Sequence, residues 1–227
     1  MKKKLKKVAW LVSNCKTHSQ REQYVSELSK YIDIDIYGGC GTKTCPENED
    51  CHNYLASKYL FYLSFENSIC KDYVTEKFWN PLSKNILPIV LGGANYSQIA
   101  PPKSYIDALN FANPKHLAKH LNYLISNSTA YNEYFQWKKY FDVKGVEDEN
   151  FAKAMCQLCK ALNDKSRPEK HYENIEKWWR NEAKCKSKGD YPWSKPEVLD
   201  AFSSIKNTVW KGAEILVDSL RESKVIV

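Results

Sequence analysis

The sequence predicts an α/β fold with a Rossmann-like parallel sheet that becomes helical toward the C-terminus. Residues 8–13, VAWLVS, are an apolar run typical of a buried strand, and REQYVSELSKYI at 21–32 has apolar residues at helical spacing. The alternating stretch DIDIYGG at 33–39 predicts another strand. Strand, helix and strand in this order form a βαβ unit, whose crossover makes the two strands parallel. From Pro114 onward the pattern is helical and glycine is nearly absent.

A second unit of the same kind follows. The loop at 39–53 is rich in cysteine, and the apolar run YLFYLSF at 59–65 predicts the next strand. A helix over 74–85 connects it to the strand LPIVLGG at 87–93, and a short extended piece follows at 104–111. Ligands of open parallel sheets bind beyond the carboxyl ends of the strands. The loops that leave those ends are therefore the places where we expect the chemistry.

The remainder of the chain predicts helices and one linker. The first helix, PKHLAKHLNYLISN at 114–127, begins with Pro at a first-turn position, where its missing N–H is not needed. The polar stretch KCKSKGDYPWSKP at 184–196 is typical of a linker. Further helices are predicted at 130–141, 150–162 and 197–222. We divide the chain into a basic leader at 1–7, a Rossmann-like domain with C-terminal helices at 8–183, and an unassigned linker and helix at 184–227.

Charge and hydropathy narrow the class of protein. The chain has 227 residues and a net charge of +7, but five lysines lie in the leader MKKKLKK, so the remainder is near +2 (7 − 5). No stripe of Lys and Arg interleaved with aromatic residues follows, which disfavours nucleic acid as a partner. No run of 18 apolar residues is present, and the apolar part after the leader is too short for a signal peptide or membrane anchor.

The eight cysteines leave three alternatives, which are disulfides in an oxidising compartment, a zinc site, and free thiols in the cytosol. Cys156 and Cys159 form the CQLC pair, and no second close pair lies at zinc-ribbon spacing. Disulfides are favoured, and we expect Cys156 and Cys159 to join each other or nearby partners. Two acceptor triplets, at Asn95 and Asn127, predict N-glycosylation in a secretory lumen.

The segment FENSICKDYVTEKFW at 65–79 holds the densest mixture of functional side chains. Glu66 and Asn67 follow a strand at its carboxyl end. The next helix can start with Asp72 or Thr75 as its cap, and its N-terminus offers free backbone N–H groups to an anion. Lys77 is placed to meet a phosphate, Glu76 to accept hydrogen bonds from ribose, and Tyr73 to supply a ring. This combination predicts a nucleotide diphosphate site. The alternative is an ordinary solvated helix start.

Arg21 is a second candidate. It begins the first crossover helix, after a loop that leaves the same sheet edge, and its fork suits a phosphate. Taken alone, it also fits a surface arginine, and His18 in that loop fits a solvated residue. Neither Gly-x-Gly-x-x-Gly nor a P-loop occurs, so a dinucleotide or NTP site is not indicated. We interpret the DID at 33–35 as the polar side of a strand, not as a metal-binding Asp-x-Asp.

The stretch YLFYLSFENSICKDYVTEKFWNPLSKNILPIVLGG, with VAWLVSNCKTHSQREQYVSELSKYI before it and CQLC after it, resembles the C-terminal GDP-fucose-binding domain of the alpha-1,3-fucosyltransferase family. The resemblance covers roughly residues 8–185. It implies one half of a GT-B glycosyltransferase and an inverting transfer of L-fucose from GDP-beta-L-fucose to the 3-hydroxyl of N-acetylglucosamine in a glycoprotein N-glycan. It also implies residence in the Golgi lumen.

The family's site residues match positions in this sequence. Arg21 and Lys77 match the cations that bind the diphosphate, while Asn67, Tyr73 and Glu76 match residues that line the donor, Glu76 holding the ribose. Glu66 matches a donor-side or structural position. The family needs no tightly bound cofactor and no divalent metal in the donor site.

In the family, an acceptor-binding domain precedes the first strand, carries the general base, and follows a stem and membrane anchor. Seven residues stand there in this sequence. We therefore expect a truncated transferase whose catalytic base is elsewhere and which is inactive alone. The alternative is a non-catalytic GDP-sugar-binding module or pseudo-enzyme.

Overall fold

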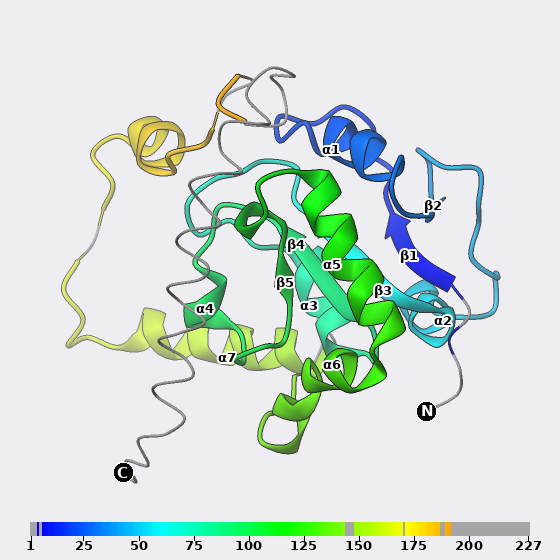
Figure 1. The fold of residues 1–227 in the computed structure, drawn as a ribbon. Helices are drawn as coiled ribbons and strands as arrows, with labels where there is room; N and C mark the ends of the chain where they lie inside the picture. Colours follow the sequence, from blue (N-terminus) through cyan, green and yellow to red (C-terminus); the bar gives the residue numbers. More distant parts are fainter. Residues whose placement is uncertain (1–3, 5, 144–147, 170, 187–188, 192–227) are drawn as a thin grey trace, which may run out of the picture.

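A computed structural model describes residues 4, 6–143, 148–169, 171–186 and 189–191, and it confirms the α/β class (Figure 1). The described residues contain one five-stranded sheet in the order β2-β1-β3-β4-β5, with every pair of neighbours parallel. The strands are β1 (Lys6–Leu11), β2 (Ile34–Tyr37), β3 (Tyr59–Phe65), β4 (Leu87–Leu91) and β5 (Ile106–Asp107).

Helices cover both faces of the sheet. Apolar residues of α1 (Arg21–Leu28) and α5 (Pro114–Ser126) pack on one face, and those of α2 (Cys51–Lys58) and α3 (Glu76–Ser83) pack on the other. The remaining elements are α4 (Tyr96–Ile99), the 3-10 turns η1 (Ala108–Asn110) and η2 (Gln136–Lys139), α6 (Ser128–Glu133), α7 (Asp148–Asn163) and the π-helical η3 (Lys177–Glu182).

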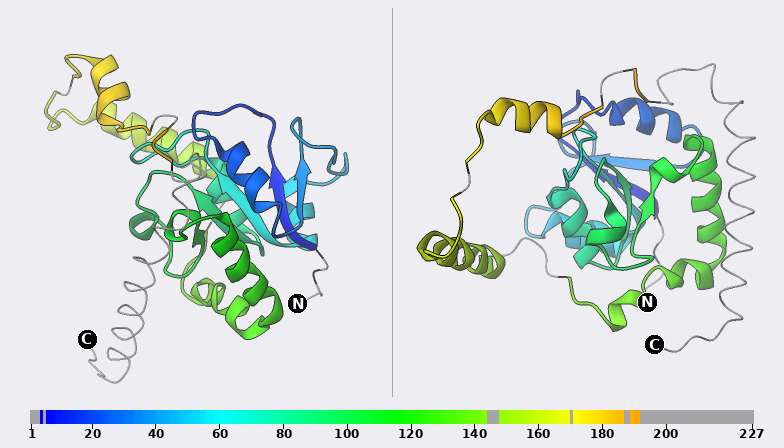
Figure 2. Two further views of the ribbon diagram at one scale, coloured as in Figure 1. Left: turned by 45° about the horizontal axis from the view of Figure 1, so that its top comes forward. Right: turned by 90° about the vertical axis from the view of Figure 1, so that its left-hand side faces the viewer.

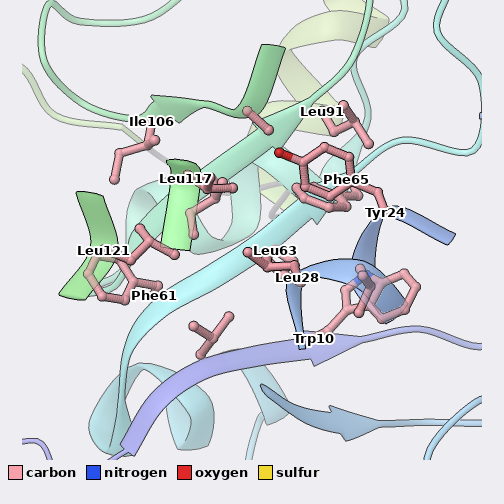
Figure 3. Packing of buried hydrophobic residues seen from close by; sticks show 14 of the residues in the cluster. Trp10, Tyr24, Leu28, Phe61, Leu63, Phe65, Leu91, Ile106, Leu117 and Leu121 are labelled. Carbon is pink, nitrogen blue, oxygen red and sulfur yellow. The ribbon is translucent and has the colours of Figure 1, made fainter. Parts of the chain in front are cut away.

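The largest hydrophobic cluster lies between the sheet and the α1/α5 layer (Figure 3). Alternate residues of β3, among them Phe61, Leu63 and Phe65, point into it because side chains along a strand alternate between the two faces. Tyr24 of α1 packs edge-on against Phe65 with ring centroids 5.5 Å apart. Each such fully buried side chain contributes about 1.5 to 3 kcal/mol to folding. This core holds the carboxyl end of β3 in place.

The strand order reverses between β1 and β3. After β1 the chain crosses to β2 on one side, and it then returns to β3 on the other side of β1. Loops that leave β1 and β3 therefore diverge above and below the sheet. In open α/β sheets this divergence creates the crevice where ligands bind.

The elements differ from the sequence prediction mainly at their ends. Helix α2 begins at Cys51, inside the stretch expected to be a loop, because the Asp50 side chain accepts a hydrogen bond from the Asn53 N–H at 2.8 Å and caps it. Helix α1 stops at Leu28 instead of continuing to Ile32. The predicted extended piece at 104–111 becomes the two residues of β5 and the turn η1.

Past residue 143 the chain leaves the sheet and later returns to it. Helix α7 confirms the predicted helix around the CQLC pair, and it stands to one side of the sheet (Figure 2). Cys185 and Tyr191, which we assigned to a linker, contact the sheet domain, and Tyr191 is 1% exposed. The predicted helix at 197–222 lies outside the described residues. None of the helices in the described ranges has the length and apolarity that crossing a bilayer requires.

Six cysteines form disulfides, whereas the pairing expected for Cys156 and Cys159 is wrong in this structure. Both are exposed free thiols on α7. On a regular helix, side chains three residues apart have Cβ atoms about 5 to 6 Å apart, whereas a disulfide needs about 3.5 to 4.5 Å. The bonded pairs are Cys15–Cys40, Cys45–Cys51 and Cys70–Cys185.

Candidate functional site

The candidate site lies at the carboxyl edge of the sheet, where the chain leaves β1 and β3. Ser19, in the loop after β1, joins the two loops: its Oγ donates to the Glu66 carbonyl at 2.7 Å and its N–H donates to the Asn67 carbonyl at 3.0 Å. Ser19 is fully buried. The two loops that carry the predicted site residues are therefore fixed relative to each other by hydrogen bonds from Ser19 to main-chain carbonyls.

Arg21 lies beneath these loops with 2% of its surface exposed, which excludes the surface-arginine alternative. Its Nη1 donates to the Phe65 carbonyl at 2.6 Å and its Nη2 donates to the Asn14 carbonyl at 2.9 Å. The guanidinium also stacks on Trp10, 5.5 Å from the ring centroid. Burial lowers the pKa of Arg21, against the opposing charge of Glu22, but arginine stays protonated. The structure thus places a buried positive charge under the crevice.

Glu66 and Thr75 organise the other side of the site. Glu66 is fully buried, and its carboxylate accepts hydrogen bonds from the Thr75 N–H at 2.8 Å and from the Thr75 hydroxyl at 2.8 Å. Burial raises the pKa of Glu66, although the hydrogen bonds from Thr75 and the charge of Lys77 act to lower it. Thr75 in turn caps α3, since its Oγ1 accepts from the Lys77 N–H at 3.4 Å. Glu66 therefore sets where α3 begins.

Lys77 lies at the open end of this network. Its Nζ is 3.0 Å from Thr75 Oγ1, 3.0 Å from Glu76 Oε1 and 3.8 Å from Glu66 Oε2, and its side chain is 22% exposed. Burial acts to raise the pKa of Glu76, but the hydrogen bond and charge of Lys77 outweigh it, so that pKa lies below its ordinary value. The site presents an ionised carboxylate and an ammonium group side by side at the first turn of a helix.

Asn67 and Tyr73 belong to the loop between β3 and α3, and both are partly buried. The side-chain oxygen of Asn67 is buried and accepts no hydrogen bond from the described residues. The Tyr73 N–H donates to the Cys70 carbonyl at 3.4 Å, after Asp72 in a left-handed conformation with φ 60°. A Cβ on Gly93 would lie 2.4 Å from the Cys70 carbonyl oxygen. Only glycine after β4 lets this loop approach so closely.

The other predicted residues lie away from this edge or outside its contacts. Asn95 is exposed, whereas Asn127 is partly buried and caps α6, accepting from the Ala130 N–H at 3.0 Å. Glycosylation at either position stays a prediction. Asp35, the second acid of DID, is paired with Lys6 at 2.8 Å and so belongs to the polar side of β2. His18 is exposed. Within the described ranges no three His, Cys, Asp or Glu side chains gather as a metal site would require.

Sequence reasoning missed one residue of the site, Ser19, because its partners are main-chain carbonyls that lie near it only after β1 and β3 have paired. Thr75 was one of the two caps that the sequence offered for the helix, and the structure confirms it as the cap of α3. The hydrogen bonds from Thr75 to Glu66 were not predicted.

Comparison with known proteins places residues 1–178 in a described family, "Glycosyltransferase family 10 (fucosyltransferase) C-term". Alpha-(1,3)-fucosyltransferase C of Drosophila melanogaster is 38% identical over 188 residues, covering 82% of this chain and 43% of that protein. Glycoprotein 3-alpha-L-fucosyltransferase A of the same organism is 42% identical over 189 residues, covering 80% of this chain and 36% of that protein. The chain thus spans less than half the length of these relatives.

Solved structures show the same fold. A crystal structure of an alpha1,3-fucosyltransferase with GDP-fucose aligns with a TM-score of 0.51 and 21% identity over 73% of this chain and 50% of that chain. A second structure, with GDP, aligns with a TM-score of 0.52 and 21% identity over 71% of this chain and 48% of that chain. At this identity the similarity concerns the fold.

Proposed function

This chain belongs to glycosyltransferase family 10, the fucosyltransferases, and from that premise we propose that it holds GDP-fucose at the carboxyl edge of its sheet. The transfer we propose is inverting: L-fucose passes from GDP-beta-L-fucose in alpha-1,3 linkage to an N-acetylglucosamine of a glycoprotein N-glycan. The chain supplies the donor half of a two-domain GT-B enzyme. Three disulfides support a secretory location, for which we propose the Golgi lumen.

The observation that carries this proposal is the arrangement of Glu76 and Lys77 at the start of α3. The Lys77 side chain is 22% exposed, so its ammonium group offers a diphosphate both positive charge and N–H donors. Glu76 is ionised and exposed, which suits acceptance of hydrogen bonds from two ribose hydroxyls. The side chain of Asn67 and the ring of Tyr73, two partly buried residues of the loop before α3, complete the proposed donor contacts.

Charge stabilisation of the departing GDP follows from these residues. As the bond from fucose to phosphate breaks, negative charge grows on the diphosphate, and Lys77 neutralises it by direct contact. Arg21 adds its charge from beneath the loops, because its two terminal nitrogens already donate to carbonyl groups. In this proposal the site does not require a divalent metal or a tightly bound cofactor.

The proton of the acceptor hydroxyl needs a general base. Glu66 does not suit that role, since its carboxylate is fully buried and engaged by Thr75. We therefore assign the base, the acceptor contacts and any membrane anchor to a part of the protein equivalent to the rest of the relatives' length. If no such part exists, the chain is a non-catalytic GDP-sugar-binding module.

Calorimetric titration with GDP tests the donor site. The wild type should bind GDP with a dissociation constant between low micromolar and millimolar, and Lys77→Ala should weaken binding by about 1 to 3 kcal/mol, the scale of a lost charge-assisted hydrogen bond. Lys103→Ala is the control, because Lys103 is exposed and pairs with Glu133 away from the site. Equal GDP affinity in the wild type and Lys77→Ala would remove Lys77 from the site.

A turnover assay tests whether the general base lies outside these 227 residues. The chain is incubated with GDP-fucose and an N-glycan acceptor, and release of GDP is followed. We expect no release at an enzymatic rate from these 227 residues. Robust release would show that a base lies within them and would contradict our assignment of the base.

A further inference from the structure

The segment that returns from α7 covers the loop that carries Asn67 and Tyr73. We call residues 183–186 together with Tyr191 the returning segment; Figure 1 draws its end in orange near the loop that leads into α1. Cys185 forms a disulfide with Cys70, across 115 positions of sequence. Two main-chain hydrogen bonds flank this disulfide: the Lys71 N–H donates to the Ala183 carbonyl at 2.7 Å, and the Lys186 N–H donates to the Ile69 carbonyl at 2.9 Å.

Tyr191 anchors the other end of the returning segment. It is 1% exposed and belongs to the main hydrophobic cluster. Its hydroxyl contacts the Lys186 carbonyl at 3.1 Å and the His18 carbonyl at 3.4 Å. His18 lies in the loop after β1, one residue before Ser19. The returning segment therefore touches both loops that form the crevice.

The loop between β3 and α3 is held at Cys70 by two other parts of the chain. Gly93 lies against Cys70, and Cys185 of the returning segment is bonded to it. The turn that positions Tyr73 starts at Cys70, whose carbonyl accepts from the Tyr73 N–H. A displacement of Cys70 therefore moves Tyr73, and Cys185 acts on Tyr73 through its disulfide with Cys70.

We infer that the returning segment is a functional part of the donor site, in which Cys185 and Tyr191 are positioning residues that hold Asn67 and Tyr73 for a nucleoside diphosphate. This inference rests on the proposed function for the identity of the ligand. It assigns a role to a stretch whose sequence is typical of a linker. The segment acts by limiting the loop to one conformation before the ligand binds, so less conformational entropy is lost on binding.

The test compares two disulfide deletions in the full chain, produced in an oxidising host. Cys70→Ser with Cys185→Ser removes the link to the returning segment, and Cys45→Ser with Cys51→Ser removes the disulfide at the start of α2. Calorimetry at a temperature where both variants are folded should show GDP binding about 10- to 50-fold weaker in the first and within twofold of wild type in the second. GDP affinity within twofold of wild type in both would overturn the inference.

Tyr191 provides a test that leaves the disulfide intact. Tyr191→Ala should weaken GDP binding about tenfold, and Tyr191→Phe, which keeps the buried ring, less than threefold. A positioning role also predicts non-additivity: Tyr73→Ala, which removes the ring, should cost less affinity in the Tyr191→Ala background than in the wild type. Full additivity would show that Tyr191 contributes to stability alone.

Hydrogen exchange without ligand distinguishes this inference from the proposed function. The amides of Lys71 and Tyr73 should exchange at least about tenfold faster in Cys70→Ser with Cys185→Ser than in the Cys45/Cys51 variant. If the wild type does not bind GDP while this difference is found, the proposed ligand is wrong and the positioning of the loop stands. Unchanged exchange at Tyr73 would refute the positioning itself.

Discussion

Arg21 and Lys77 are both cations at the carboxyl edge of the sheet, yet the structure surrounds them differently. Arg21 begins α1, is 2% exposed and donates to the carbonyls of Phe65 and Asn14. Lys77 lies in the first turn of α3, is 22% exposed and contacts the side chains of Thr75, Glu76 and Glu66. The first cation shapes the loops, and the second stays available to a ligand. Matching charges in a sequence motif can therefore have unequal roles in stability.

The largest expected effect on folding is that of Arg21→Ala. It leaves two carbonyls unpaired and a cavity against Trp10, so the free energy of unfolding should fall by about 3 kcal/mol or more. Lys77→Ala is the matched comparison and should change stability by about 0.5 kcal/mol or less. Urea denaturation measures both. Similar losses of unfolding free energy from the two substitutions would show that Arg21 and Lys77 do not differ in their contribution to folding.

Glu66→Gln should change how stability depends on pH. The pKa of Glu66 is raised above 4.5 in the folded state, so the native protein holds this proton more tightly than the unfolded chain does. The free energy of unfolding contributed by this group therefore falls as pH rises from the unfolded pKa through the folded pKa.

The measurement is a series of urea denaturations of the wild type and Glu66→Gln across that pH range. The wild type should lose stability relative to the variant as pH rises, because the variant cannot ionise at this position. Glu76 titrates in both proteins and largely cancels in the difference. A difference that stays constant with pH would mean that Glu66 has no raised pKa.

Thr75→Ala should lower stability less than Arg21→Ala does. It removes the cap of α3 and one hydrogen bond to Glu66, for a loss of about 1 kcal/mol in stability. Because Lys77 Nζ also contacts Thr75 Oγ1, GDP affinity should fall as well. Thr75→Ser keeps the hydroxyl and should restore both. If Thr75→Ala lowers stability but leaves GDP affinity unchanged, Thr75 caps α3 without contributing to the ligand site.

Much of the fold could be predicted from local patterns. The apolar runs at 8–13, 59–65 and 87–93 became neighbouring strands, and Pro114 opens α5 as its sequence indicates. The ends of the elements were predicted less well. Helix α2, for example, begins inside the loop expected at 39–53, because Asp50 caps it there. The position of Glu76 and Lys77 in the first turn of a helix could also be predicted, because a helix cap and a first turn depend on neighbouring residues in the sequence.

The sequence by itself determined the α/β class, the family resemblance and the side chains that meet at the end of β3. Period-two and helical spacing, caps and motifs are local, so they can be recognised before folding is known. Only the tertiary structure decided that Arg21 is buried and donates to two main-chain carbonyls. It also decided which cysteines pair: Cys185 is bonded to Cys70, whereas Cys156 and Cys159 are free. Those outcomes depend on contacts between residues far apart in sequence, which strand order and packing bring together.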